Sequence, residues 1–584
     1  MTSPHHLDYI IIGAGPAGMQ LAYFLQSAGR SYVILEAREQ AGGSFDVYPR
    51  HRTLLSLNKR HTWFSEIEYQ MRHDWNSLLT DDNSHLFRDY SDELYPNADD
   101  LHRYLLDFAT KYALNIEYGV QVTRIGREGH FVVDDAAGVR RTAERLIMAT
   151  GPRRELLPAI EGIEDAETYC SHDLDRELYA NKRVLIIGKG NSAFEVGEHL
   201  AGHAAFVHIG LDNKQLKMAW QTHFPGNLRA INNTILDMYF LKAQHALLGC
   251  SFTRIEKERD GAFLCHWEEH MPHWSPPGTV RSTYTYDHVI VCTGFSFVEP
   301  ALFASEINVE VDPCGKFPRL SSSWESTEPG LYFIGTAMAA RDRQAASSFI
   351  HGFRYNIRTL FRLLEHRYYG ESLPALRLPL DNPDDLFALA NFVLRRLSTA
   401  AALVPLFGVM CDVLAFRPDG VEYLYELPVG LVADHPELIG ASEYITLTFE
   451  LGKEHFPENA DNLKHIHFPP GPACSSFAHA RLRHFRDGVE VAMMPLDETL
   501  TIRYDATYSE SQSTGPWPPM VINFLDRVAG LLASPLPVPR YKLTFEPWGD
   551  KVPVQDASVP RCRETIDPNS LYMPHVGEKL GQES

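Results

Sequence analysis

Short apolar runs alternate with longer amphipathic stretches through the first 370 residues of the chain. Apolar side chains at helical spacing from Ser347 to His366 predict one long helix. The apolar runs are too short for helices and predict buried parallel strands, at residues 9–12, 33–35, 146–148, 184–187, 289–292 and 331–334. This alternation predicts an α/β fold.

Two of the predicted strands lead into glycine fingerprints that are typical of dinucleotide-binding turns. The first contains Gly13, Gly15 and Gly18, and the second contains Gly188 and Gly190, with Ser192 expected in place of the third glycine. Glycine permits a tight turn and lets the backbone approach a pyrophosphate, whose charge is favoured by the following helix N-terminus. Two such sites can bind two dinucleotides, so one nucleotide could pass a hydride to the other.

An acidic residue supports the first fingerprint. Glu36 ends the second predicted strand, where a carboxylate can accept hydrogen bonds from a ribose 2′-hydroxyl. The alternative is an exposed turn carboxylate, and the surrounding fingerprint favours the ribose contact. After the second fingerprint, Asp212 suits a ribose hydroxyl and NADH, whereas Lys214 and Lys217 suit the 2′-phosphate of NADPH.

The order of these signals predicts two Rossmann-like dinucleotide-binding domains, the second inserted in the first, plus a C-terminal α+β extension. The expected boundaries are residues 1–157 and 300–370 for the first domain, 158–299 for the second, and 371–584 for the extension and its tail. Within the extension, the Pro- and Leu-rich residues 371–380 predict a linker, residues 385–397 a helix and residues 444–449 a strand. The polar sequence beyond about residue 550 predicts a poorly ordered tail.

Composition narrows the function classes. The net charge of −21 is spread without acidic blocks, which disfavours nucleic acid or an anionic membrane as a partner. The longest apolar stretch, Ala400 to Cys411, is interrupted by Pro405 and is too short to span a bilayer. Neither end carries a signal-peptide or retention pattern, so we expect a cytoplasmic protein, with a homo-oligomer among the open options.

The eight cysteines include no Cys-x-x-Cys pair, which excludes the redox dithiol of the thioredoxin-reductase type. We expect them to be reduced structural thiols. His266 and His270 stand four residues apart, as in a zinc helix, but Trp267 occupies the place of the metalloprotease glutamate. A hairpin turn signal precedes this segment, so we expect a strand there and no metal site.

These motifs resemble the flavin-containing monooxygenases, a family with two dinucleotide-binding domains. Further matches are the turn at Gly42–Phe45, the segment Leu54–Lys59, the helix start at Tyr95–Pro96 and the turns at residues 149–151 and 292–294. Over roughly residues 8–370 the chain more closely resembles the FAD-dependent oxidoreductases known as endoplasmic-reticulum flavoproteins associated with degradation. The shared stretches are residues 48–52, 58–60, 72–79, 190–195, 228–233 and 349–355.

The chain departs from both groups. It lacks a clean F-x-G-x-x-x-H linker of the monooxygenases, since Gly162 and His172 stand at the wrong spacing. It also lacks the signal peptide and retention signal of the closer group, so the secretory-pathway role is not carried over.

The resemblance implies that the first domain binds FAD and the second NADPH, with NADH not excluded. The cofactor-binding residues that it implies are Gly13, Gly15, Pro16, Ala17, Gly18, Glu36, Gly43, Ser44, Asn58, Val122, Thr150, Gly151, Gly188, Gly190, Asn191, Ser192, Lys214, Gly335 and Ile350.

The resemblance also implies an activity. It is that of an FAD-dependent, NAD(P)H-driven monooxygenase, which forms a C4a-(hydro)peroxyflavin with dioxygen and oxygenates a small nucleophile, such as an amine or amino-acid nitrogen. Asn58 would be a fixed amide near the flavin, and its alternative is a turn residue that caps a helix. Lys59 and Arg60, with Arg72, would bind a carboxylate or phosphate, and their alternative is a solvated surface.

Two other functions stay open. One is an NAD(P)H oxidase or reductase that passes electrons to a protein or a small-molecule acceptor. The other is a flavin-bearing protein that binds a partner through residues 371–584.

Overall fold

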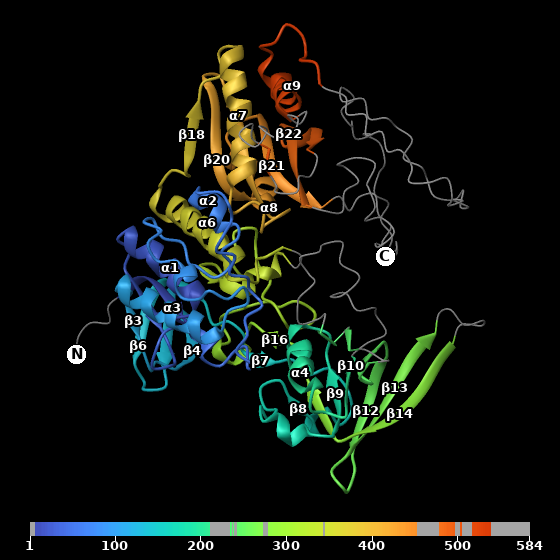
Figure 1. Cartoon of the computed structure of the whole chain (residues 1–584). Coiled ribbons are helices and arrows are strands. Elements are labelled where there is room, and N and C mark those ends of the chain that lie inside the picture. Colours follow the sequence, from blue (N-terminus) through green and yellow to red (C-terminus); the bar gives the residue numbers. More distant parts are fainter. Residues whose placement is uncertain are drawn as a thin grey trace, which may run out of the picture. The chain divides into compact units, whose positions relative to one another are not determined.

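The computed structural model describes residues 6–210, 234–235, 237–238, 242–271, 278–342, 345–451, 478–496, 503–504 and 517–538. The chain forms two compact units (Figure 1). The first contains the described residues up to 63 together with 73–361, and the second contains 64–72 and the described residues from 362 onward. No helix of the described residues is long and apolar enough to cross a bilayer.

The first unit begins with a mixed sheet, in which β1 pairs in parallel with both β2 and β6. Its strands are β1 (His6–Ile12), β2 (Tyr32–Leu35), β3 (Ile116–Glu117), β4 (Val122–Glu128), β5 (His130–Asp135), β6 (Arg140–Met148) and β17 (Leu331–Phe333). The order is β3-β2-β1-β6-β5-β4, with β17 pairing in parallel with β6. The predicted insertion is confirmed, because β17 joins this sheet only after the second sheet has been completed.

The helices of this first domain follow from its apolar pattern. They are α1 (Pro16–Ser27), α3 (Ala98–Lys111) and α6 (Ile350–Tyr369), and the last confirms the long helix predicted from Ser347. Helix α3 buries one face, with Leu101, Leu105 and Phe108 at helical spacing. The domain also contains two short 3-10 turns, η1 (Gly43–Asp46) and η7 (Gly335–Ala340).

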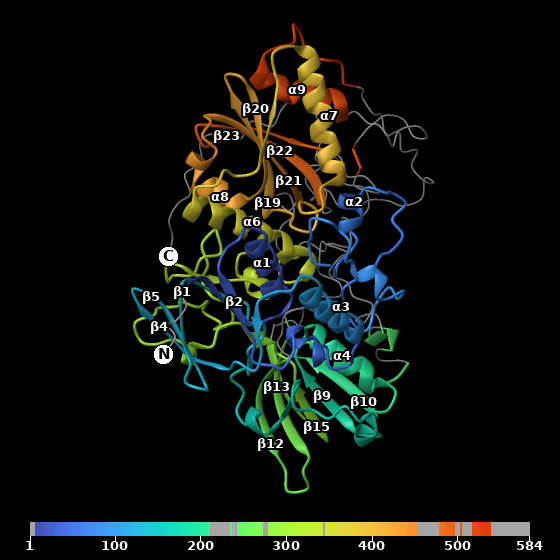
Figure 2. The same ribbon diagram turned by 90° about the vertical axis from the view of Figure 1, so that its left-hand side faces the viewer.

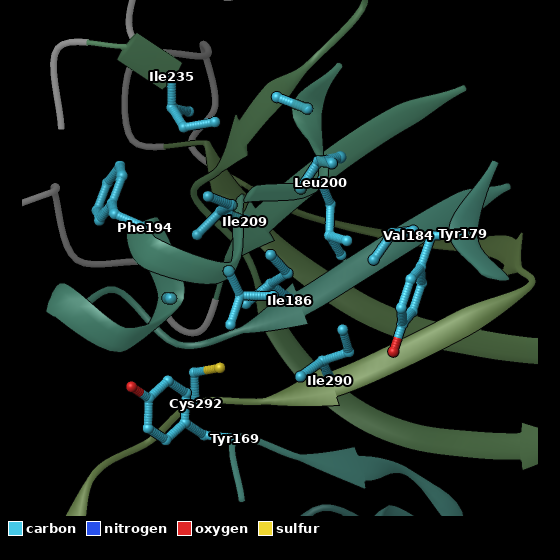
Figure 3. Close-up of a cluster of buried hydrophobic side chains, with 14 residues drawn as sticks. Tyr169, Tyr179, Val184, Ile186, Phe194, Leu200, Ile209, Ile235, Ile290 and Cys292 are labelled. Carbon is cyan, nitrogen blue, oxygen red and sulfur yellow. The ribbon is translucent and has the colours of Figure 1, made fainter. Parts of the chain in front are cut away.

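The second domain of this unit contains a parallel sheet in the order β11-β10-β9-β15-β8. Its elements are β8 (Glu167–Thr168), β9 (Arg183–Ile187), α4 (Asn191–Ala201), β10 (Phe206–Gly210), β11 (Ala246–Leu248) and β15 (His288–Val291). The branched side chains of β9, β10 and β15 pack on α4 in one buried cluster (Figure 3). This core fixes the start of α4 beside the strand ends.

An antiparallel sheet of β12 (Ser251–Lys257), β13 (Phe263–Met271) and β14 (Gly278–Tyr286) follows. Because residues 265–270 lie in β13, their prediction as a strand is confirmed. The short strands β7 (Arg154–Glu155) and β16 (Phe295–Ser296) pair with one another.

The second unit is an antiparallel sheet in the order β18-β20-β19-β21-β22-β23, with α7 packed against α9 (Figure 2). Its elements are α2 (Ile67–Met71), β18 (Ala375–Leu378), α7 (Pro383–Thr399), β19 (Met410–Arg417), β20 (Gly420–Pro428), α8 (Val429–Asp434), β21 (Glu443–Leu451), β22 (Ala478–Arg486), β23 (Val489–Pro495) and α9 (Trp517–Ala529). Helix α7 and strand β21 contain the predicted helix and strand, so the α+β extension is confirmed.

One expectation of the extension is wrong. Residues 371–380 do not form only a linker, because β18 lies within them and pairs with β20, from Ala375 opposite Leu424 to Leu378 opposite Val421. This pairing partner lies more than 40 residues later in the chain, where a local Pro- and Leu-rich pattern carries no signal of it. The domain boundaries stay predictions, and the tail beyond residue 550 lies outside the described residues.

Candidate functional site

The glycine turn of the first fingerprint, which follows β1, packs closely against the backbone at the end of β6. We call this contact a glycine joint. Gly13 has φ of +108° and donates its N–H to the carbonyl of Leu35 at 2.9 Å. A Cβ atom on Gly13 would lie 2.6 Å from the carbonyl oxygen of Ala149. Glycine is therefore required both by its backbone conformation and by the space, and Thr150–Gly151 follow directly after this contact.

The second fingerprint repeats this joint. Gly188 has φ of +148° and donates its N–H to the carbonyl of Gly210 at 2.9 Å. A Cβ atom on Gly188 would lie under 3.0 Å from the carbonyl oxygen of Cys292, which precedes Thr293–Gly294. The same arrangement of strand, glycine and facing carbonyl is thus built twice.

The register of the two joints corrects one prediction. Ser192 does not take the place of the third glycine, because the residue five positions after Gly188, as Gly18 is after Gly13, is the buried Ala193. A Cβ atom on Gly18 would lie under 3.0 Å from the carbonyl oxygen of Gly13, so glycine is needed there. The second helix accommodates a methyl group in the corresponding position.

The N-termini of α1 and α4 fit an anionic ligand. Gly15 and Gly190 are their N-caps, neither helix has a side-chain cap, and neither carries an acidic residue in its first turn. By contrast, Asn97 caps α3 and Asn382 caps α7, and two aspartates follow each cap. A Cβ atom on Gly190 would meet no atom within 4 Å. The open N–H groups and the free space are what a dinucleotide pyrophosphate requires.

The other residues predicted for the first site gather around α1. A Cβ atom on Gly43 would lie 2.9 Å from the Cα of Gly15, and one on Gly335 would lie 2.8 Å from the Cβ of Ala17. Ser44 stands next to Gly43 in η1, and Pro16 occupies the first turn of α1, where a proline is well tolerated. The structure therefore brings these residues together at one sheet edge.

Glu36 is not an exposed turn carboxylate. Its side chain is buried and accepts the N–H of Ala14 at 2.7 Å and the N–H of Arg38 at 2.9 Å. Val120 also donates its N–H to the carbonyl of Glu36, and the buried Val122 begins β4 two residues later. A carboxylate offers about four lone pairs, so Glu36 retains acceptor capacity for a ribose.

Asn58 is buried, and its position is fixed by both backbone and side chain. Its N–H donates to the carbonyl of Leu94 at 3.0 Å, and its Nδ2 donates to the carbonyl of Ser91 at 2.7 Å. The backbone of Asn58 also forms a bridge with Asp74. The Asp74 carboxylate in turn accepts the N–H groups of Asn76 and Ser77.

Helix α6 also contacts this segment. The fully buried Arg354 donates to the carbonyl of Ser77 at 2.7 Å. Trp75 stacks on His351 with ring centroids 4.1 Å apart and an interplanar angle of 14°. The structure thus brings Asn58 together with the start of α6, where the buried Ile350 lies.

Sequence reasoning assigned no role to Asp74, His351 and Arg354, although all three fall in the shared stretches. That location was the one signal that could have found them.

The three predicted cations differ in their surroundings. Lys59 is exposed, and Arg60 forms an ion pair with Asp92. Arg72 is buried in the second unit, where it donates to the carbonyls of Leu397 and Ala400, and burial lowers its pKa to about 10. Arg72 therefore serves the packing of α7 and not an open anion site. The catalytic roles of Asn58, Lys59 and Arg60 stay predictions.

The second site has a small pocket at the first turn of α4. Its lining residues are Glu155, Leu157, Tyr169, Ser192, Val291, Cys292, Thr293, Gly294 and Phe295. The Oδ1 atom of Asn191 is buried and accepts no hydrogen bond from the described residues. Lys214, with Asp212 and Lys217, lies outside the described residues, so the choice between the two nicotinamide dinucleotides stays a prediction.

The two cysteines near this pocket, Cys170 and Cys292, are poor nucleophiles because their thiols stay protonated at neutral pH. The Cys170 thiol lies 2.8 Å from the hydroxyl of Tyr48, and burial is the main cause that raises its pKa to about 11. Burial also raises the pKa of Cys292. Among the described residues, no three His, Cys, Asp or Glu side chains are grouped so that they could hold a metal ion.

Comparisons with known proteins identify the family of the chain. The pyridine nucleotide-disulphide oxidoreductase family matches the chain over residues 10–335. The chain belongs to this family. It is 36% identical over 479 residues to the mouse (Mus musculus) FAD-dependent oxidoreductase domain-containing protein 2, covering 77% of the chain and 71% of that protein. The zebrafish (Danio rerio) protein of the same name is 33% identical, with the same shares covered.

Among solved structures, the bacillithiol disulfide reductase of Staphylococcus aureus covers 62% of the chain and 99% of its own length, with 17% identity and a TM-score of 0.47. More distant sequence relatives include both monooxygenases and thioredoxin reductases. The protein is a flavin-dependent oxidoreductase of a family that uses FAD and a nicotinamide cofactor. The predicted resemblance to FAD-dependent oxidoreductases is confirmed.

Proposed function

We propose that the protein is an FAD-dependent, NADPH-driven monooxygenase that uses dioxygen to oxygenate a small nucleophile, such as the nitrogen of an amine or amino acid. The single observation that carries this proposal is the fixed, buried amide of Asn58. A primary amide has two N–H donors, and the carbonyl of Ser91 takes one of them. The second N–H has no acceptor among the described residues and would bind a polar atom of the flavin.

The cysteines support oxygen over a dithiol as the electron acceptor. The chain has no Cys-x-x-Cys pair. The raised pKa of Cys170 keeps its thiol protonated at neutral pH, and a protonated thiol is a poor nucleophile and redox group. With no Cys-x-x-Cys pair in the sequence and a protonated Cys170, we favour dioxygen over a dithiol as the electron acceptor.

In this proposal the chain's own residues bind the two dinucleotides and the substrate. Bound FAD would supply hydride acceptance and the oxygen chemistry. The glycine joints and uncapped helices would hold the two pyrophosphates, and Glu36 would hold a ribose. Lys59 is exposed and would attract the carboxylate of an amino-acid substrate. Asp212 suits NADH, whereas Lys214 and Lys217 suit the 2′-phosphate of NADPH. We assign NADPH because the resemblance to the flavin-containing monooxygenases favours it.

The test is a two-step stopped-flow experiment on the purified full-length protein with bound FAD. The flavin is first reduced anaerobically with NADPH and then mixed with oxygenated buffer, with and without amines and sulfides. We expect a transient spectral species between reduced and oxidised flavin, and an oxygenated product with an accepted substrate. Asn58→Ala should shorten the lifetime of that species at least about tenfold, which corresponds to about 1.4 kcal/mol.

Asn115→Ala is the control for loss of an amide hydrogen bond, because the exposed Asn115 also donates its amide to a backbone carbonyl, that of Tyr32, at 2.6 Å. It should leave the lifetime unchanged. Direct return to oxidised flavin with stoichiometric hydrogen peroxide, and no product from any substrate, would contradict the monooxygenase and favour the oxidase or reductase. No reduction by NADPH or NADH would contradict both nicotinamide-driven activities.

A further inference from the structure

Hydrogen bonds between the two dinucleotide-binding domains meet at one buried tyrosine. Tyr169 follows β8 and is 4% exposed. Its hydroxyl donates to the Glu195 carboxylate at 2.8 Å and accepts the N–H of Arg50 at 3.2 Å. Arg50 lies in the loop that follows η1 of the first domain, and Glu195 lies in α4 of the second. One hydroxyl therefore connects the two domains.

The same loop makes further contacts around Tyr169. The Arg50 guanidinium donates to the carbonyls of Tyr169 and His172, both at 2.7 Å. Tyr48 stacks on Tyr169 with ring centroids 6.0 Å apart and an interplanar angle of 19°. These contacts hold residues 48–50 against residues 169–172, so the hydroxyl acts within an ordered interface and not as an isolated bond.

Tyr179 provides an internal comparison. It belongs to the same buried cluster as Tyr169 (Figure 3) and is 1% exposed. Its hydroxyl also donates to a carboxylate, Glu167 at 3.1 Å, and also accepts a backbone N–H, that of Asp173 at 3.1 Å. All partners of the Tyr179 hydroxyl lie in the second domain. The two hydroxyls thus differ mainly in whether they connect the domains.

Both ends of the Tyr169 connection lead to dinucleotide sites. Glu195 lies one turn after Asn191 and Ser192, at the pyrophosphate end of α4, and Tyr169 itself lines the pocket there. Arg50 follows Gly43 and Ser44 of the first site by a few residues. Transfer of a hydride requires the two reacting atoms about 3–3.5 Å apart, and a 1 Å misplacement can cost about a hundredfold in rate.

We propose that Tyr169 is a positioning residue for hydride transfer: its hydroxyl sets the start of α4 relative to the flavin-binding loop, and so sets the nicotinamide relative to the flavin. This inference rests on the nicotinamide-to-flavin step of the proposed function. The hydride leaves the reduced nicotinamide as an electron pair with a proton and reduces FAD, while the nicotinamide is oxidised. Tyr169 takes no part in the bonds that change.

The test compares Tyr169→Phe with Tyr179→Phe in the full-length protein. Each variant removes one hydroxyl from the same cluster, so we expect similar, small decreases in thermal midpoint. Only Tyr169→Phe should slow flavin reduction at saturating NADPH, by roughly 10- to 100-fold. It should also weaken the long-wavelength charge-transfer absorbance of NADPH with oxidised flavin, while the dissociation constant of NADP⁺ stays within about threefold. Glu195→Gln should retain more of the rate than Glu195→Leu, because glutamine keeps an acceptor oxygen.

Amide hydrogen exchange gives a second readout that needs no turnover. Tyr169→Phe should speed the exchange of the Arg50 amide, and Tyr179→Phe should speed that of the Asp173 amide. Equal reduction rates in the two variants, or an unchanged Arg50 amide in Tyr169→Phe, would overturn the positioning role alone. A wild-type flavin that neither NADPH nor NADH reduces would overturn the proposed function together with this inference.

Discussion

The helix of the first fingerprint packs onto its glycine turn without room for a methyl group, whereas the helix of the second carries one. Gly18 faces the carbonyl of Gly13, and Ala193 stands in the corresponding position of α4. All residues of α1 from Pro16 to Leu25 are buried, while the first turn of α4 is partly exposed and the space before Gly190 is open. We call the first joint a closed seat, because α1 packs on its turn with no room for a methyl group, and the second an accessible seat, because the space at Gly190 is open. This difference suits a cofactor that stays bound and a coenzyme that must leave after each turnover.

The largest effect should come from exchanging glycine and alanine at the two corresponding positions, Gly18 and Ala193. Gly18→Ala places a Cβ atom against the Gly13 carbonyl, and the backbone must shift to relieve the overlap, at a cost of about 3 kcal/mol. We expect a protein with little bound flavin and a lower thermal midpoint. Ala193→Gly should cost only about 1 kcal/mol, from helix propensity, and should leave the flavin bound.

The measurement is the ratio of flavin to protein absorbance after purification, together with the thermal midpoint of each variant. A Gly18→Ala protein that retains stoichiometric flavin would contradict the closed seat. An Ala193→Gly protein that loses its flavin would show that the two joints do not act separately.

The sequence predicts the local features of both joints but not the contacts that assemble the site. The strands, the glycine joints and the long helix could be predicted because each signal is local: an apolar run, a spacing of two to five residues, or a helical period. The contacts that assemble the site are not local. Arg354 and Ser77 are 277 residues apart, and Tyr169 and Glu195 are 26 apart. The sequence does not predict strand β18 for the same reason. It predicts Arg72 in an anion-binding cluster or on a solvated surface, because no local pattern shows the carbonyls to which Arg72 donates.

A second effect, which reaches a similar size only above about pH 7, should come from the buried carboxylates, which also differ between the two sites. Glu36 accepts two backbone N–H groups, whereas within the described residues Glu195 accepts one hydrogen bond, from Tyr169. Burial is the main cause that raises the pKa of Glu195 from 4.5 to about 7. The folded state therefore holds a proton up to about pH 7 that the unfolded state releases near pH 4.5. Stability from this group is present below pH 4.5 and is lost as the pH rises to about 7, by up to about 3 kcal/mol.

Glutamine does not titrate, so Glu195→Gln should remove this part of the pH dependence. We expect the variant to match the wild type near pH 5 and to have a thermal midpoint a few degrees higher near pH 8. Glu164→Gln is the control in the same domain, because Glu164 is exposed and its substitution should change little. Parallel pH profiles of wild type and Glu195→Gln would contradict the buried-carboxylate explanation.

The smallest effect on stability, and the sharpest separation of folding from binding, should come from Gly190→Ala. Gly190 has φ of −93° and ψ of −177°, which alanine adopts without strain, and its Cβ would meet no atom within 4 Å. The cost to folding should stay below about 1 kcal/mol, from the weaker N-cap alone. The added methyl group would instead occupy the space that a pyrophosphate needs, so the dissociation constant of NADP⁺, measured by calorimetry, should rise about tenfold, or about 1.4 kcal/mol. Bound flavin is the internal control, because the first joint is untouched. Unchanged NADP⁺ affinity in a folded, flavin-loaded Gly190→Ala protein would mean that the open space before α4 is not the coenzyme site, and the comparison between a closed and an accessible seat would fail at that point.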